Sequence, residues 1–524
     1  MQDLASWGKD DSEKAWNQRQ IRKKIHHLRE VQNFKSFYSR LGFPKGAAFY
    51  VRPEEGYLTQ PLDHFNRRNN GTYKQRYWIN EEFWKRPDGP VFLFIGGESA
   101  ESEFSVLAGE HVELAQKHQA LLVSLEHRYY GASINQDGLT LEAIRFLSSQ
   151  QALADLASFH LFISQKYNLT RENTWICFGG SYPGSLSAWF RIKFPHLVYA
   201  AVASSAPVRA KLDFTDYNKV VAQSLSDPVI GGSTKCLDKV RESFQAVDSI
   251  LHSGNVSKLE KDFYSCLPLR APEDYGEFVS NLADIFMGAV QYNMETPGSD
   301  VRKICDRIVG AESAYEGLRI VNSMYMDYIG LKCVENSHEK TLSDLRNTQL
   351  NPVGVGERQW YYQTVHRVWL LTDRYFQRSI FFLAMLFLLS LIPPLPSADQ
   401  TCEDGSCPFS PLITLKSQLD LCTEIFQIHA ESVRKSVEFT NEFYGADHPK
   451  SSRIIFVNGD IDPWHALSVL KNQSRSEIAI FINGTAHCAN MGSSRPTDPP
   501  ALQKAREEIA SKIGEWLHNA RMTE

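Results

Sequence analysis

A serine flanked by glycines, which joins an apolar run to a helix-like segment, constrains the fold of this chain more than any other feature. The sequence Gly179-Gly180-Ser181-Tyr182-Pro183-Gly184 lies between residues 175–178 and 186–191. A sharp strand-to-helix turn needs glycines there, because a Cβ would collide with the neighbouring strand or helix. Such a turn exposes the hydroxyl group near the positive end of the helix dipole. The match to G-x-S-x-G is imperfect, since proline takes the place of the second glycine, and the pattern also occurs in plain loops. It predicts a serine nucleophile.

An acid and a histidine follow this serine in the order that α/β hydrolases require. Asp462 and His487 each come after a short strand-like run. We prefer Asp462 to Asp460, because a proline fixes the backbone directly after Asp462, and we expect Asp460 to be a turn residue. His465 is the alternative to His487.

Short apolar runs rich in β-branched residues recur along the chain and end in polar or glycine-containing loops. They cover residues 91–95, 121–125, 175–178, 199–203, 453–457 and 478–482. Runs of this kind are typical of parallel strands that are buried on both faces and separated by helices, such as the one expected around 147–165. Ligands bind beyond the carboxyl ends of such strands, where the candidate residues lie. The sequence therefore predicts an α/β fold with a mostly parallel sheet and flanking helices.

The stretch between Ser181 and Asp462 is far longer than one crossover needs, and the alternation of strands and helices stops at about residue 209. An inserted, mostly helical cap explains both observations, and caps shape a substrate cavity and exclude water from it. We expect an N-terminal extension at 1–45, a first part of the α/β domain at 46–208, the cap at 209–345 and a second part at 346–524.

The composition limits the classes of function. The chain has 524 residues, of which 43% are hydrophobic and 22% are charged, so it can bury a large core. Its net charge of −5 gives no reason to expect a nucleic-acid partner or binding to an anionic membrane. The sequence has no H-E-x-x-H motif, no P-loop and no G-x-G-x-x-G after a strand, so we expect no metal and no other cofactor.

Nine scattered cysteines and five N-x-S/T sequons indicate the secretory pathway. The sequons begin at Asn70, Asn168, Asn255, Asn472 and Asn483. No signal peptide is visible, because residues 1–40 lack an apolar stretch of the required kind. We expect glycosylation at the five asparagines and a location inside the secretory pathway.

The motifs of the chain together resemble a known family. They are Gly96-Gly97-Glu98, Glu126-His127-Arg128-Tyr129-Tyr130-Gly131, Gly179-Gly180-Ser181-Tyr182, Ser204-Ser205-Ala206-Pro207-Val208, Asn458-Gly459, Asp462-Pro463-Trp464 and Ala486-His487. This set resembles the prolyl carboxypeptidase and dipeptidyl peptidase II family of serine peptidases, from about residue 55 to about residue 515. The resemblance implies an α/β-hydrolase fold with a helical cap, exopeptidase-like hydrolysis of peptides with proline on the acyl side of the cut, and an endosomal or lysosomal location. It also implies a triad of Ser181, Asp462 and His487, and a proline pocket lined by Trp464.

In such a triad, His487 accepts the proton of Ser181 as the serine attacks the scissile carbonyl, Asp462 orients the imidazole, and water releases the acyl-enzyme. We expect the backbone N–H groups of Tyr182 and Gly97 to form the oxyanion hole. The charged trio Glu126-His127-Arg128 is expected to form a hydrogen-bonded network that fixes loops, not to act in acid–base chemistry.

Two other functions are compatible with the same sequence features. An esterase or acyltransferase would need the same triad, and a catalytically silent binding protein could retain the hydrolase fold. The expected partners are peptide substrates, and a homodimer is the candidate assembly.

One segment departs from the family. After Thr364, where the relatives continue with a cysteine, this chain has Val365 and an apolar insertion at about 365–400. The apolar run at 380–392 is too short to span a membrane, which takes about 20 residues. Because the cysteine count is also odd, we hypothesise that the segment is translated intron or a splice variant and leaves one cysteine without its disulfide partner.

Overall fold

The computed structural model describes residues 52–135, 137–293, 300–350, 356–366, 398–399, 401–402 and 405–522. Its centre is an eight-stranded sheet with the order β1-β2-β4-β3-β5-β6-β9-β10. The strands are β1 (Glu54–Pro61), β2 (Thr72–Asn80), β3 (Val91–Ile95), β4 (Leu121–Leu125), β5 (Trp175–Gly180), β6 (Ala200–Ser204), β9 (Ile454–Gly459) and β10 (Glu477–Ile482). From β4 to β10 every neighbouring pair is parallel, whereas β1 and β2 are antiparallel. The predicted α/β fold is therefore confirmed.

The six predicted runs are the parallel strands, with ends that shift by one or two residues. The antiparallel strands β1 and β2 were not predicted, for a physical reason. Their sequences, EEGYLTQP and TYKQRYWIN, mix polar and apolar residues because β1 is largely exposed and β2 has exposed positions in its first half. Strands covered on only one side lack the continuous apolar run that marks a buried parallel strand.

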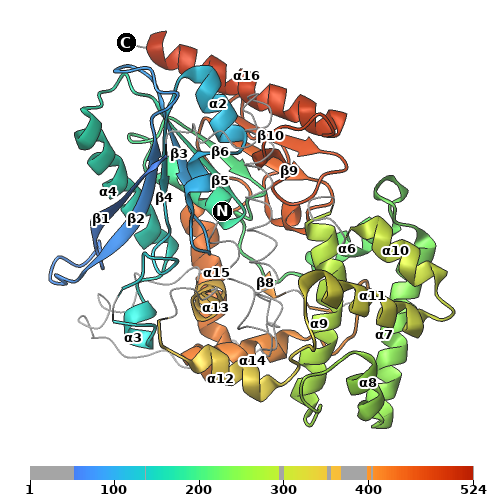
Figure 1. Ribbon diagram of the computed structural model, residues 1–524. Coiled ribbons are helices and arrows are strands. Elements are labelled where there is room, and N and C mark those ends of the chain that lie inside the picture. Colours follow the sequence, from blue (N-terminus) through green and yellow to red (C-terminus); the bar gives the residue numbers. More distant parts are fainter. Residues whose placement is uncertain are drawn as a thin grey trace, which may run out of the picture.

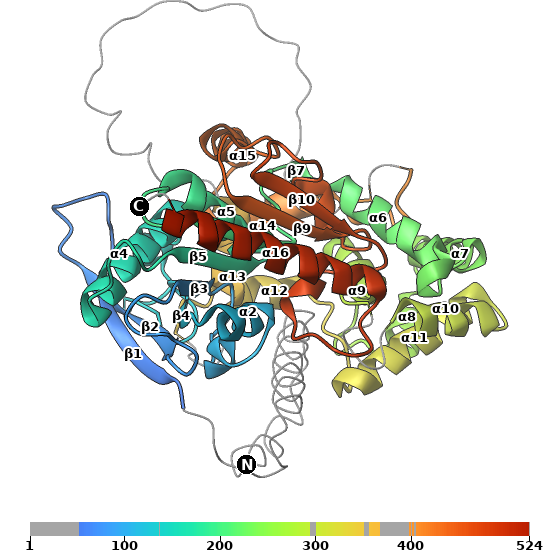
Figure 2. The same ribbon diagram turned by 90° about the horizontal axis from the view of Figure 1, so that it is seen from above.

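Helices cover both faces of the sheet (Figures 1 and 2). Successive strand residues point to opposite faces, so Leu93 and Cys177 pack toward α4 (Ser149–Tyr167) and α5 (Tyr182–Lys193). Phe92 and Ile176 pack on the other face, toward the cluster that contains α2 (Glu110–His118) and α16 (Pro500–Met522). The sheet is thus the middle of three layers, and its carboxyl edge remains for loops that carry polar residues.

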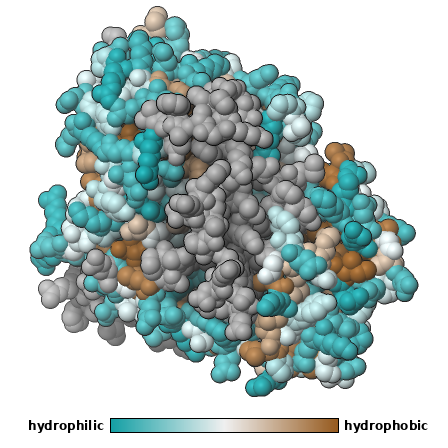
Figure 3. Space-filling model, in the orientation of Figure 1, coloured by the Kyte–Doolittle hydropathy of each residue, from teal (hydrophilic) through white to brown (hydrophobic). Residues whose placement is uncertain are grey.

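A mostly helical insertion follows β6 and lies beside the sheet (Figure 1). Its helices are α6 (Thr215–Ser226), α7 (Thr234–Ser253), α8 (Val256–Asp262), α9 (Pro272–Gln291), α10 (Val301–Gly310) and α11 (Ala314–Ile329). Its apolar core includes Phe244 and Phe286, and it continues to Ile461 and Leu467 in the loop after β9. Hydrophobic residues also appear on the surface over this insertion (Figure 3).

The remaining elements lie between these strands and helices along the chain. They are η2 (Glu103–Val106), α3 (Leu141–Ile144), β7 (Leu212–Asp213), η3 (Pro228–Ile230), α12 (His338–Arg346), α13 (Glu357–His366), β8 (Ala398–Asp399), α14 (Leu415–Phe426), α15 (Ala430–Tyr444), η4 (Pro463–Leu467) and η5 (Ala489–Met491). Strands β7 and β8 form a second, parallel pair.

Six of the nine cysteines form disulfides. The Cys236–Cys305 bond joins α7 to α10, the Cys266–Cys333 bond joins the segments after α8 and α11, and the third bond links Cys402 to Cys407. The other three cysteines are buried: Cys177, Cys422 and Cys488. The first two disulfides tie the helices of the insertion together, and a bond of this kind typically stabilises a fold by roughly 2–4 kcal/mol.

Several predictions from the sequence concern residues that lie outside the described ones. These include the N-terminal extension at 1–45 and nearly all of the insertion at 365–400. Among the described residues, no helix is both long and apolar enough to cross a membrane.

Candidate active site

Ser181 occupies a strained turn between β5 and α5. Its φ of 62° and ψ of −130° lie in a region that L-residues rarely adopt. A Cβ on Gly179 would lie 2.2 Å from the carbonyl oxygen of Pro183, and one on Gly184 would lie 2.6 Å from the carbonyl oxygen of Ser204. After Ser181, the position where a neighbouring backbone segment leaves no room for a side chain is thus Gly184 and not residue 183. This explains why the turn tolerates Pro183 in place of the second glycine of the motif.

Asp462 and His487 form a buried hydrogen bond of 2.9 Å between Oδ1 and Nδ1. Asp462 follows β9 and is completely buried, and His487 follows β10 with 4% of its surface exposed. Oδ1 of Asp462 also accepts the backbone N–H of Trp464 at 3.0 Å. The structure therefore brings this acid and this histidine together.

The two alternative residues have other contacts. Oδ1 of Asp460 accepts the backbone N–H of Gly484 at 2.7 Å and so joins the loops after β9 and β10. His465 lies in η4, and its ring stands edge-on to Phe481 at a centroid distance of 5.2 Å. Asp460 is therefore a turn residue, as expected. Among the hydrogen bonds of the described residues, none joins the His465 ring to the Asp462 carboxylate.

Backbone and side-chain contacts bring the serine turn, the end of β6 and the histidine loop together. The N–H of Ser181 donates to the carbonyl of Ser204 at 2.9 Å. The next residue, Ser205, accepts the N–H of Cys488 on its Oγ at 2.8 Å. A Cβ on Gly180 would lie 2.8 Å from Sγ of Cys488. The chain neighbours of Ser181 and His487 are therefore in direct contact.

The protonated form of His487 is favoured in this setting. Burial by itself would lower the pKa of His487, but the nearby Asp462 carboxylate and the adjacent Cys488 side chain together hold that pKa well above its usual value. A carboxylate at Nδ1 stabilises the imidazolium that forms when the ring accepts a proton. Asp462 is therefore placed to stabilise the positive charge that His487 carries once the ring has accepted a proton.

The two candidate oxyanion donors lie on facing segments. Tyr182 is the first residue of α5 and is fully buried, and a Cβ on Gly97 would lie 2.7 Å from Cγ of Pro183. His127 holds the Tyr182 side chain, with Nε2 of His127 3.1 Å from the tyrosine Oη. Because Nδ1 of His127 lies 2.8 Å from a backbone carbonyl, it must carry the proton, so Nε2 accepts from the tyrosine hydroxyl. The contact of Gly97 with Pro183 therefore places the loop after β3 against the serine turn.

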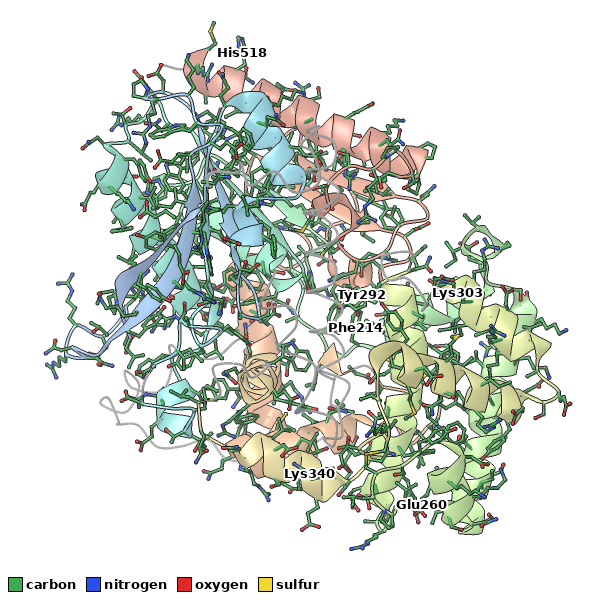
Figure 4. All side chains as sticks on the ribbon, viewed as in Figure 1. Phe214, Glu260, Tyr292, Lys303, Lys340 and His518 are labelled. Atoms are coloured by element: carbon green, nitrogen blue, oxygen red, sulfur yellow. A yellow bond between two sulfur atoms is a disulfide. The ribbon has the colours of Figure 1, made fainter. Side chains whose placement is uncertain are left out.

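The helical insertion reaches the histidine directly. The N–H of His487 donates to the carbonyl of Gln291, at the end of α9, at 3.0 Å. Oε1 of Gln291 accepts from the hydroxyl of Tyr217 at 2.7 Å, and its Nε2 lies 2.9 Å from the hydroxyl of Tyr292. The Tyr292 ring stands edge-on to the His487 ring, at the junction of the insertion and the sheet (Figure 4). Gln291, Tyr217 and Tyr292 were not predicted from the sequence, because no local pattern in a helical insertion marks the turn that contacts a distant loop.

Trp464 belongs to an aromatic cluster at the same junction. Its ring centroid lies 5.6 Å from the rings of Phe214 and Tyr217. Phe214 and Tyr217 are buried, whereas Trp464 is half-buried. Such a cluster provides an apolar wall close to Asp462.

The charged trio after β4 is hydrogen-bonded, as the sequence predicted. Arg128 donates from Nε and Nη2 to both carboxylate oxygens of Asp155, at 2.6 and 2.7 Å. The same carboxylate accepts from the hydroxyl of Tyr73 and lies 2.7 Å from Nε2 of His64. This network is buried and joins the loop after β4 to α4 and to the segment between β1 and β2.

The five sequon asparagines are all exposed. Glycosylation at Asn70, Asn168, Asn255, Asn472 and Asn483 stays a prediction. Among the described residues, no group of three or more His, Cys, Asp or Glu side chains could hold a metal ion.

A buried glutamate behind the serine turn makes stability depend on pH. Glu110 accepts from Nδ2 of Asn490 at 2.9 Å, and the same nitrogen lies 2.9 Å from Oγ of Ser204. Burial raises the pKa of Glu110 to about 7 from 4.5. The folded state therefore prefers the protonated form, and it loses stability as the pH rises from 4.5 through 7. The full loss is roughly 3 kcal/mol.

We expect Glu110→Gln to remove this part of the pH dependence. Urea unfolding at pH 4.5, 6 and 8 measures it, with the exposed Glu507→Gln as control. The wild type and the control should lose stability over this range more steeply than Glu110→Gln. Equal slopes in all three proteins would contradict the prediction.

Sequence comparisons bear on what this site does. A model of the family described as serine carboxypeptidase S28 matches residues 60–378 and 397–509. The chain belongs to this family. It is therefore a serine peptidase, a hydrolase that acts on peptides. The family match leaves out 379–396, which lie within the apolar insertion noted in the sequence.

Similar proteins span nearly the whole chain. The thymus-specific serine protease of Homo sapiens is 39% identical over 510 residues, which are 96% of this chain and 93% of that protein. A putative serine protease of Caenorhabditis elegans, K12H4.7, is 32% identical over 88% of each chain. The lysosomal Pro-X carboxypeptidase of Bos taurus is 27% identical over 88% of this chain and 87% of its own.

Proposed function

We propose that this S28 peptidase cleaves peptides through an acyl-enzyme, with Ser181 as nucleophile, His487 as general base and Asp462 as the residue that orients the imidazole. The observation that carries the proposal is the buried hydrogen bond between Asp462 and His487, because the residue after His487 lies against Gly180 of the strained serine turn. His487 would accept the proton of Ser181 and then pass it to the leaving amine. Water would release the acyl group by the reverse sequence of proton transfers.

The backbone N–H groups of Tyr182 and Gly97 are the proposed oxyanion donors. Two observations support them: Tyr182 directly follows the serine at the start of α5, and the Gly97 backbone lies against Pro183. Donors placed in advance stabilise the charge that develops on the carbonyl oxygen, and each is worth about 10²–10³ in rate.

We further propose an exopeptidase that prefers proline on the acyl side of the cut. The apolar wall of Trp464, Phe214 and Tyr217 suits a compact ring. A relative named Pro-X carboxypeptidase supports the preference. The helical insertion that touches His487 would close the site around one end of the peptide.

The proposed location is the lumen of the secretory pathway or of lysosomes. The three disulfides, the five exposed sequons and the lysosomal relative support it. The homodimer stays a prediction, because the structure describes one chain.

Two sets of substrates test the proposal. The first set contains peptides with one internal proline and an acetylated or free amino end, combined with an amidated or free carboxyl end. We expect a cut after proline that capping one end abolishes, with the products measured by mass spectrometry. The second set contains aryl esters, and hydrolysis of esters without peptides would favour the esterase or acyltransferase.

A fluorophosphonate probe, which reacts with activated serines, separates an enzyme from a silent binding protein. We expect labelling at Ser181, located by peptide mapping. A folded protein that the probe does not label would contradict the proposed function.

A further inference from the structure

A completely buried glutamate at the end of β4 joins three segments. Oε1 of Glu126 accepts from Nη2 of Arg76 in β2 at 2.6 Å and from the N–H of Glu101 at 3.0 Å. Its Oε2 accepts from the N–H of Ala132 at 3.0 Å and from Oγ of Ser133 at 2.6 Å. A carboxylate has about four acceptor sites, so these donors saturate it.

The loops around Glu126 are packed so closely that two of their glycines have no room for a side chain. A Cβ on Gly131 would lie 1.9 Å from Oε1 of Glu126, and one on Gly96 would lie 2.9 Å from Cγ of Glu101. Arg76 also donates to the carbonyl of Glu101 at 3.0 Å. The far end of the 96–101 loop is therefore fixed by Glu126 and Arg76 through both backbone groups of Glu101.

The near end of the same loop is fixed by the sheet. The N–H of Gly96 donates to the carbonyl of Leu125 at 3.0 Å, so the loop leaves β3 in register with β4. Between the two anchors lies Gly97, whose backbone contacts Pro183 of the serine turn. An error of about 1 Å in the position of a donor is enough to lower a catalytic rate by about 10²-fold.

We propose that Glu126 is a positioning residue for the oxyanion hole, because its carboxylate clamps the 96–101 loop against the serine turn. The inference rests on the proposed function, in which the N–H of Gly97 is an oxyanion donor. Glu126 touches neither substrate nor nucleophile in this role, and it acts through the loop.

The test compares full-length wild type, Glu126→Gln and Glu55→Gln. Glu55 is a matched control, because its carboxylate lies 3.7 Å from the same arginine, Arg76, but is 46% exposed. The amide of Glu126→Gln keeps the shape of the side chain but turns an NH₂ group toward two of the donors. We expect the rate of fluorophosphonate labelling at Ser181 to fall about 10²-fold in Glu126→Gln, the effect of losing one oxyanion donor, and to stay unchanged in Glu55→Gln.

A second measurement distinguishes positioning from a general loss of structure. A dipeptide aldehyde ending in proline forms a tetrahedral adduct that needs the oxyanion hole, whereas the matching alcohol only binds. We expect Glu126→Gln to weaken binding of the aldehyde about 10²-fold and to leave binding of the alcohol unchanged. Equal weakening of both, or a wild-type labelling rate, would overturn the inference.

Two further outcomes are decisive. If Glu126→Gln does not fold, Ser133→Ala removes one donor and retains the carboxylate, and it should slow labelling about tenfold; unchanged labelling in folded Ser133→Ala would overturn the inference. If the wild type is not labelled at all, the proposed function fails, and the clamp loses its role with it.

Discussion

Replacing Ser181 by alanine should lower kcat by about 10⁴- to 10⁶-fold on any peptide that the wild type cleaves. The alanine removes the attacking oxygen and leaves the surrounding hydrogen bonds intact, since the backbone N–H at this position still donates to Ser204. Purified Ser181→Ala and the exposed control Ser253→Ala would be compared by product release. A Ser181→Ala enzyme within tenfold of the wild type would remove Ser181 from the mechanism.

The backbone strain at Ser181 allows a second test at the same position, which measures stability. Because the φ of Ser181 is 62°, glycine relieves strain there that alanine retains. We expect Ser181→Gly to lose the same activity and to unfold at a higher urea concentration than Ser181→Ala, with a gain of about 1 kcal/mol. Lower stability of the glycine variant would contradict a strained turn.

Asp462→Ala should lower kcat by about 10⁴-fold with little change in KM. The substitution removes the oxygen that accepts from Nδ1 of His487, so the imidazole loses both its fixed tautomer and the charge that stabilises its protonated form. Removing the carboxylate also removes one of the groups that raise the pKa of His487. We therefore expect the acid limb of the pH–kcat profile to move to lower pH.

The asparagine variant should retain more activity than the alanine variant. Oδ1 of Asp462 accepts both from His487 and from the N–H of Trp464. In Asp462→Asn, the Trp464 N–H selects the carbonyl oxygen of the new amide over its NH₂ group, so the correct histidine tautomer survives although the charge is lost. Side-by-side kinetics of Asp462→Asn and Asp462→Ala measure the difference. A loss in the asparagine variant equal to or larger than that in alanine would show that the tautomer is not held in this way.

Much of the architecture could be predicted because parallel strands carry a local signal. Each of the six runs is apolar over about five residues and ends in a polar loop, and burial on both faces requires that pattern. The positions of Ser181, Asp462 and His487 followed from the same runs. The pair β1 and β2 gave no such signal, since exposure allows polar residues at several of their positions.

The local role of glycines was only partly predictable. Gly179 and Gly180 were expected to allow the serine turn, but the approach of the backbone at Gly184 depends on β6, a strand that comes later in the chain. Likewise, Glu126 was expected in a network of charges, but its donors come from β2 and from loops on either side of it. Spacing in a sequence does not encode which distant segment a side chain meets.

The sequence by itself determined the order of the six parallel strands along the chain, the serine turn and the chain order of serine, acid and histidine, because each depends on neighbouring residues and on burial. Only the tertiary structure decided that Gln291 of the insertion accepts the N–H of His487, and that the loop of Gly97 is clamped at Glu101. Those contacts join residues far apart in the chain. They arise when the packed core fixes the distances between its loops, and no local pattern records them.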